Sequence, residues 1–174
     1  MRRVRYCVAM SLDGYIAGPN GEADWIVIDP DYDFAELYGE FDTYLIGRKT
    51  FESTGGQDRG SMPGVRTFVF SRTLRQADYK NLTIVGDDWK EVVQSLREED
   101  GKKDIWLFGG GSLFRSLAEA GLVDTVEVAV IPTILGGGVP LIAEPAPRIK
   151  LELQAQDVYK ETGTVDLVYS VERA

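Results

Sequence analysis

The sequence predicts an α/β fold with a mixed, mainly parallel β-sheet. Apolar segments of strand composition alternate with helical patterns along most of the chain, which is typical of parallel strands joined by crossover helices. The chain then ends in two long strand-like segments, 151–159 and 164–172, around a turn at residues 161–163. These segments predict an antiparallel hairpin at one edge of the sheet, and residues 1–174 are expected to form a single domain.

The expected strands are short runs rich in β-branched and aromatic residues. The first, V-R-Y-C-V-A-M, is mostly apolar, as expected for a strand that is buried on both faces of a sheet. Pro132 ends the strand that begins at Thr125. In chain order, the expected strands span 4–10, 43–46, 66–70, 82–85, 104–108, 125–131, 151–159 and 164–172.

Helical signals lie between these strands. In residues 31–41, apolar residues recur with the spacing of one helical face, and the Asp29-Pro30 pair suits the start of that helix. In residues 88–99 the apolar residues again share one face. Gly121 suits the C-terminal cap of a separate helix at 112–120. The expected helices span 31–41, 49–53, 88–99 and 112–120, whereas turn signals in 11–21 and glycines up to residue 64 predict loops.

The composition excludes several kinds of chemistry. The chain has no histidine and one cysteine, Cys7, which excludes Ser–His and Cys–His catalysis, histidine-ligated zinc and intrachain disulfides. Catalysis is therefore expected to use carboxylates, Lys, Tyr, hydroxyls, backbone dipoles or a cofactor, with no metal. No apolar run approaches the roughly 18 residues that cross a bilayer, and no signal-peptide pattern is present. We therefore expect a cytoplasmic protein without membrane contact.

Charge is unevenly distributed along the sequence. The net charge of −9 argues against a nucleic-acid partner. Residues 6–47 contain nine acids and no Lys or Arg, whereas residues 48–75 contain six cations against two acids. The second segment is either a set of solvated side chains or a local anion site on an otherwise acidic protein.

The segment that runs from an expected strand through Gly109, Gly110 and Gly111 into Ser112 predicts a phosphate site. Glycines allow close approach of the backbone to a ligand, and the free N–H groups and dipole of the following helix favour negative charge there. The glycine spacing is not the Rossmann fingerprint. A tight turn with close packing of strand and helix is the alternative interpretation.

Two basic turns predict further anion sites. Residues 47–50 (G-R-K-T) follow one expected strand, and Ser71 and Arg72 follow the next. Because the carboxyl ends of parallel strands meet at one edge of a sheet, we expect these turns to lie near the glycine turn and bind a dinucleotide. An arginine beside a hydroxyl suits a ribose 2′-phosphate, so NADPH is favoured over NADH. Solvated loops are again the alternative.

Four segments together resemble the dihydrofolate reductase superfamily over nearly the whole chain. The sequence is most similar to stand-alone homologues of the C-terminal reductase domain of the bifunctional riboflavin-biosynthesis deaminase–reductase. The segments are 10–18 (M-S-L-D-G-Y-I-A-G), 45–53 (L-I-G-R-K-T-F-E-S), 109–111 (G-G-G) and 131–141 (I-P-T-I-L-G-G-G-V-P-L).

The resemblance implies a twisted eight-stranded sheet flanked by helices in three layers, with NADPH across its edge. It also implies a cis peptide bond within the glycine turn. Ala9 and Ile16 would lie beside the nicotinamide, and the other residues implied in cofactor binding are Gly47, Arg48, Lys49, Thr50, Ser71, Arg72, Gly109, Gly110, Gly111, Ser112, Leu113 and Phe114.

A carboxylate is the natural proton source for reduction at nitrogen in a chain without histidine. By its resemblance to dihydrofolate reductases, which place one on the first helix, Asp31 matches best and Asp33 is the second candidate. Asp13, in a turn shared with the riboflavin reductases, is the third. All three also suit ordinary roles as helix-start or turn-forming acids.

The sequence departs from the dihydrofolate pattern at two positions. Arg66 stands one residue after the position usual for the arginine that holds folate, and this shift points it to the opposite strand face. Ala129 replaces a threonine that usually supports the carboxylate.

The leading hypothesis is therefore reduction of the ribosylaminopyrimidine of riboflavin synthesis, with dihydrofolate second and a non-catalytic NADP-binding protein as the rival. Because relatives are often dimers, a homodimer through the terminal hairpin is also open.

Overall fold

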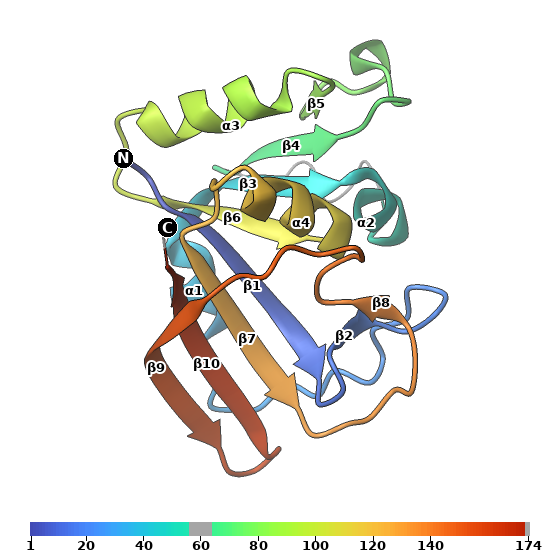
Figure 1. Ribbon diagram of the computed structural model, residues 1–174, viewed down its shortest axis with the longest axis vertical. Coiled ribbons are helices and arrows are strands. Elements are labelled where there is room, and N and C mark those ends of the chain that lie inside the picture. The colour runs from blue at the N-terminus through green and yellow to red at the C-terminus, as the bar shows by residue number, and fades with distance from the viewer. Residues whose placement is uncertain (56–63, 173–174) are drawn as a thin grey trace.

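The computed structural model describes residues 1–55 and 64–172, and within them an eight-stranded sheet forms the centre of the molecule (Figure 1). The strand order is β5-β4-β3-β6-β1-β7-β10-β9. The strands are β1 (Val4–Ser11), β3 (Phe41–Gly47), β4 (Arg66–Phe70), β5 (Thr83–Val85), β6 (Asp104–Gly109), β7 (Thr125–Ile131), β9 (Leu151–Tyr159) and β10 (Thr164–Val171).

The strands from β5 to β7 are parallel to their neighbours, and β10 runs antiparallel to both β7 and β9. The predicted mixed sheet with a C-terminal antiparallel hairpin is therefore confirmed. The parallel order brings the carboxyl ends of β3, β6, β1 and β7 to one edge. Because β10 is antiparallel, its amino-terminal half reaches the same edge.

Helices cover both faces of the sheet and make three layers. On one face, α3 (Trp89–Glu98) and α4 (Gly111–Glu119) bury Val93, Leu96 and Leu117 against residues of the inner strands such as Leu45 and Leu107. On the other face, α1 (Phe34–Gly39) packs Leu37 against a smaller aromatic cluster that contains Trp106 and Phe41. Elsewhere in the described residues, the helical segments are α2 (Arg48–Ser53) and the 3₁₀ turn at Gln76–Asp78.

The prediction of a helix over residues 31–41 is wrong at both ends. Helix α1 begins at Phe34, because Asp33 caps it by accepting a hydrogen bond from the Glu36 amide at 2.9 Å. Asp31 lies before the helix, where its amide donates to Asp29 Oδ1 at 3.0 Å in a local turn. Phe41 opens strand β3 rather than completing the helical face.

A second small sheet was also missed. Within the expected loop 11–21, β2 (Tyr15–Ala17) pairs antiparallel with β8 (Val139–Pro140). Gly138 lies so close to this pair that a Cβ on it would sit 2.1 Å from the Ala17 carbonyl oxygen. Most of the expected glycine-rich loop, with Arg59, lies outside the described residues. In the described part of the chain, no helix is long and apolar enough to cross a membrane.

Candidate active site

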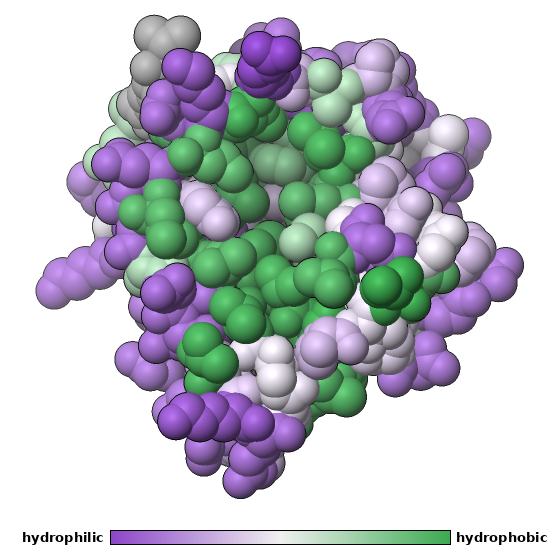
Figure 2. All heavy atoms as spheres, turned by 60° about the horizontal axis from the view of Figure 1, so that its bottom comes forward, coloured by the Kyte–Doolittle hydropathy of each residue, from purple (hydrophilic) through white to green (hydrophobic). Residues whose placement is uncertain are grey.

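A cavity of about 1270 Å³ extends along the edge where the strand ends meet. Its lining comes from the ends of β3, β6, β1, β7 and β10 in that spatial order, together with the loop before α1 and the β2 and β8 segments. On the face drawn in Figure 2, hydrophobic side chains gather around a hollow. A cavity of this size is large enough for a dinucleotide and a further small molecule.

The glycine turn lies at one end of this cavity. Gly110 and Gly111 line it at the start of α4, whose N-terminus no side chain caps. Gly109 has a φ of +117°, and the Gly109–Gly110 peptide bond is cis. A Cβ on Gly111 would lie 2.5 Å from the Pro140 carbonyl oxygen, so only glycine fits. The uncapped amides therefore remain available to an anion.

The predicted basic turn lies against the glycine turn. A Cβ on Gly110 would come within 3.1 Å of Thr50 Oγ1, and one on Gly47 within 3.5 Å of the Gly109 carbonyl oxygen. Arg48, Lys49 and Thr50 all line the same end of the cavity, beside Ser112. The structure thus brings together two of the three predicted anion-binding turns.

The third turn is adjacent but lies outside the cavity lining. Phe70 pairs with Gly47, so Ser71 and Arg72 follow β4 beside the start of α2. Ser71 Oγ accepts hydrogen bonds from the amides of Thr73 and Leu74 at 3.1 and 3.0 Å. The guanidinium of Arg72 pairs with Asp87 at 3.1 Å, with both side chains more than four-fifths exposed. Such an exposed pair is weak, so Arg72 can exchange partners.

The remaining residues predicted to contact the cofactor divide between the cavity and the core. Ala9, Ile16 and Leu113 line the cavity. Phe114 instead packs in the core, with its ring 4.1 Å from that of Tyr6. Gly109 lies behind the lining, where its carbonyl oxygen approaches Gly47.

None of the three predicted acids lines the large cavity. Asp31 borders a separate hollow of about 310 Å³ beside the turn of the hairpin, and Asp33 caps α1. Asp13 accepts hydrogen bonds from Ser11 Oγ at 2.7 Å and from the amides of Leu135 and Gly136 at 3.1 and 2.8 Å. It therefore joins two loops. A catalytic role for these acids stays a prediction that no contact supports.

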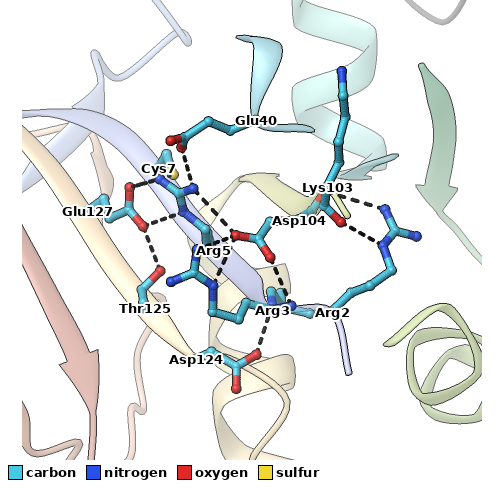
Figure 3. A network of polar contacts seen from close by, with 11 residues as sticks. Arg2, Arg3, Arg5, Cys7, Glu40, Lys103, Asp104, Asp124, Thr125 and Glu127 are labelled. Carbon is cyan, nitrogen blue, oxygen red and sulfur yellow. Dashed lines mark hydrogen bonds and ion pairs between the residues drawn. The ribbon is translucent and has the colours of Figure 1, made fainter. Parts of the chain in front are cut away.

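Three other acids line the cavity, and Glu127 on β7 is one of them. It accepts two hydrogen bonds from Arg5, both at 2.7 Å, and one from Thr125 Oγ1 at 2.7 Å (Figure 3). Burial raises the pKa of Glu127, but the hydrogen bonds from Arg5 and Thr125 outweigh it and leave the pKa lowered. Glu127 is thus a paired, ionised carboxylate.

Asp29 is also fully engaged. Its Oδ2 accepts hydrogen bonds from the Thr162 hydroxyl at 2.8 Å and the Thr162 amide at 3.2 Å, while Oδ1 accepts from the Asp31 amide. Burial opposes ionisation of Asp29, but these hydrogen bonds leave its pKa lowered. Asp29 therefore connects the loop before α1 to the hairpin turn.

Asp166 on β10 is the third lining acid, and it differs from the other two. Its Oδ1 is buried and has no hydrogen-bond partner among the described residues. Burial, followed by the negative charges of Asp157 and Glu127, raises the pKa of Asp166 to about 6. Sequence analysis missed this residue, although a lone acid in the apolar run V-D-L-V-Y is a signal, since buried charges need partners.

Aromatic side chains from the segment around α1 form a further wall of the cavity. Tyr32 and Phe34 line the cavity with ring centroids 4.6 Å apart, and Tyr38 lies 5.6 Å from Trp106. Such surfaces suit the face of a planar ring. Arg66 lies away from this wall and pairs with Glu99 at the amino end of β4, whereas Ala129 lines the cavity.

Solved structures with the same architecture identify the fold as dihydrofolate reductase-like. A putative riboflavin biosynthesis protein from Shewanella sp. PV-4 matches with a TM-score of 0.79 and 24% identity, over 99% of this chain and all of that one. Dihydrofolate reductase from Enterococcus faecalis in complex with NADP(H) matches with a TM-score of 0.71 and 17% identity, over 98% and 97% of the two chains.

Sequence comparison assigns the chain to one family among the proteins with this fold. It belongs to the RibD C-terminal domain family, whose profile matches residues 2–165. The uncharacterized protein YyaP of Bacillus subtilis (strain 168) is 35% identical over 97% of this chain and 94% of its own length. The expected resemblance to stand-alone riboflavin-type reductase domains is therefore confirmed.

Proposed function

We propose that the protein is an NADPH-dependent reductase that transfers hydride to a C=N or C=O group of a planar pyrimidine- or pterin-like heterocycle. The observation that carries the proposal is one continuous cavity whose β3–β6 end offers uncapped amides and cations and whose β7–β10 end offers aromatic rings and carboxylates. Membership of the RibD C-terminal domain family and the fold shared with an NADP(H)-binding reductase support it.

The residues at the β3–β6 end fit a dinucleotide. The amides at Gly110, Gly111 and Ser112 would bind the diphosphate, helped by the cations of Arg48 and Lys49. Ser71 and Arg72, just beyond the lining, would bind a ribose 2′-phosphate and thereby favour NADPH over NADH. When bound, NADPH supplies the hydride.

The remaining residues would position the reaction. Ala9 and Ile16 are small or apolar and line the middle of the cavity, where they leave room for the nicotinamide. The aromatic wall would hold the substrate ring parallel to it and exclude water. A carboxylate at the β7–β10 end would orient the ring and hold a proton near the accepting nitrogen. These roles need no histidine.

Within this class, the ribosylaminopyrimidine of riboflavin biosynthesis, 5-amino-6-(5-phosphoribosylamino)uracil, is the leading candidate from the family, and dihydrofolate is the second. The test is to titrate the purified protein with NADPH and NADH, and then to follow NADPH oxidation with a panel of aminopyrimidine ribosides and pteridines. We expect tighter binding of NADPH and oxidation with at least one compound. Binding without any oxidation would favour a non-catalytic NADP-binding protein, and no binding of either nucleotide would refute the proposal.

A further inference from the structure

The charges that line the cavity are separated by sign. In the described part of the lining, the lysine and arginine side chains are Arg48 and Lys49, which follow β3. The acids lie at the opposite end, with Glu127 on β7, Asp166 on β10 and Asp29 bound to the hairpin turn. Four strand spacings separate β3 from β10, which corresponds to roughly 19 Å. A ligand group at the β10 end therefore meets negative charge and no cation of the described lining.

Asp166 is the acid at this end that has unused hydrogen-bonding capacity. Glu127 is held by Arg5 and Thr125, and Asp29 by Thr162. Asp166 stands opposite Ala129 on β7, whose side chain donates nothing, and opposite Asp157 on β9, another carboxylate. Its buried Oδ1 has no partner among the described residues. A bound molecule with N–H or O–H groups would supply the hydrogen-bond donor that Asp166 Oδ1 lacks among the described residues.

The aromatic wall limits the shape of that molecule. Tyr32 lines the cavity together with Asp166, and its ring lies 5.4 Å from that of Tyr159, which pairs with Thr164 two residues before Asp166. A planar ring stacked on Tyr32 or Phe34 would therefore present its edge to the carboxylate. A carboxylate binds N–H donors best when they lie in one plane, as in an aminopyrimidine edge.

From this arrangement we infer that Asp166 is the substrate-recognition residue, and that it selects a neutral or cationic heterocycle with N–H donors on its edge over a phosphorylated one. The inference rests on the proposed function and narrows its substrate class. A phosphate group at this end would stand near Asp166 without a countercharge from the described lining, and the Asp166 carboxylate would repel it. The inference therefore favours an unphosphorylated substrate over the phosphoribosyl compound that the family suggests.

The test measures dissociation constants in the 174-residue protein saturated with NADPH. Diaminopyrimidine has N–H donors on its edge, dimethoxypyrimidine has the same ring without them, and an aminopyrimidine riboside is compared with its phosphate monoester. We expect the wild type to bind diaminopyrimidine at least tenfold more tightly than dimethoxypyrimidine, and the riboside at least tenfold more tightly than its monoester.

The variants Asp166→Asn and Asp166→Ala should weaken diaminopyrimidine binding at least tenfold, with NADPH binding changed less than twofold. The matched control is Glu152→Gln, which removes one negative charge from the same hairpin on β9, outside the cavity lining. It should change neither constant by more than twofold. Tighter binding of the monoester, unchanged binding in both Asp166 variants, or no binding of any N–H probe would overturn the inference. If the wild type itself does not bind NADPH, the proposed function is refuted instead.

Discussion

Asp166 and Asp157 face each other directly across the antiparallel pair formed by β10 and β9. Two like charges in opposite positions of neighbouring strands destabilise a sheet. The cavity surface at Asp166 is therefore arranged at some cost to stability, as is common where a protein keeps a site ready for a ligand. Because the pKa of Asp166 is raised, the free energy of unfolding should depend measurably on pH.

Asp166→Asn should stabilise the ligand-free protein at neutral pH. The folded-state pKa of Asp166, about 6, lies above its ordinary value of 3.8. Between these values the folded state binds more protons than the unfolded state, so this residue makes the free energy of unfolding fall as pH rises. Allowing for the exposed part of the side chain, we expect a gain of about 1 kcal/mol at pH 7 and none near pH 3.5.

Thermal denaturation at both pH values measures this effect, and the gain corresponds to about 2–4 °C in Tm at pH 7. Glu152→Gln is again the control, and it should leave the difference in Tm between pH 7 and pH 3.5 the same as in the wild type. An Asp166→Asn protein that loses stability at pH 7 would show that the carboxylate is paired in the folded state.

Replacing Arg72 with Ala should weaken NADPH binding much more than NADH binding. Loss of a charge-assisted hydrogen bond to the 2′-phosphate costs roughly 1.5–3 kcal/mol, or about 10- to 150-fold in affinity. Arg75→Ala removes the same charge a few residues further along the chain, beyond the strand end, and is the matched control. Equal losses for the two nucleotides in fluorescence titrations would remove the replaced arginine from the 2′-phosphate site.

Gly111→Ala should destabilise the protein and obstruct the cofactor end of the cavity. The new Cβ would lie 2.5 Å from the carbonyl oxygen of Pro140 and 3.1 Å from that of Leu141, and neither backbone can move freely. We expect a loss of about 2 kcal/mol in the free energy of unfolding, together with weaker NADPH binding. At Gly137 a Cβ would meet no atom within 4 Å, so urea denaturation should find Gly137→Ala nearly neutral. A stable Gly111→Ala protein that binds NADPH normally would contradict the close packing described here.

Variants of the acids predicted from the sequence, Asp31 and Asp13, can be compared directly with variants of Asp166. Asp31→Asn should leave turnover within about threefold of wild type, because Asp31 borders the separate hollow beside the hairpin. Asp13→Ala should raise KM and speed hydrogen exchange at the amides of Leu135 and Gly136, which lose their acceptor. If Asp31→Asn abolishes turnover while Asp166→Asn does not, the proton relay lies at the start of the first helix, as the resemblance implies.

The sequence was sufficient to predict most of the sheet but not the loops around the cavity. Alternating strand and helix signals predicted β7 and β9 with correct bounds, because their patterns are long and local. The error at Asp31 arose because Asp29 does not begin a helix but binds Thr162, more than one hundred residues away. The pairing of β2 with β8 is likewise a contact between distant short segments.

The same reason explains why the candidate site was only partly predicted. The glycine and basic turns are local motifs, and their contact follows from the parallel order of β3 and β6. Asp166, in contrast, becomes distinctive only when Glu127 is seen to be paired with Arg5, 122 positions earlier in the chain. Which carboxylate is left without a partner is a property of tertiary packing, and no local pattern encodes it.

The most direct test of this account is a crystal structure of the protein with NADPH and diaminopyrimidine bound together. The account predicts the diphosphate at the amides of Gly110–Ser112 and the N–H groups of the pyrimidine within hydrogen-bonding distance of the Asp166 carboxylate. A dinucleotide bound away from the glycine turn, or a pyrimidine ring that contacts Asp31 or Asp33 while Asp166 stays unoccupied, would contradict it.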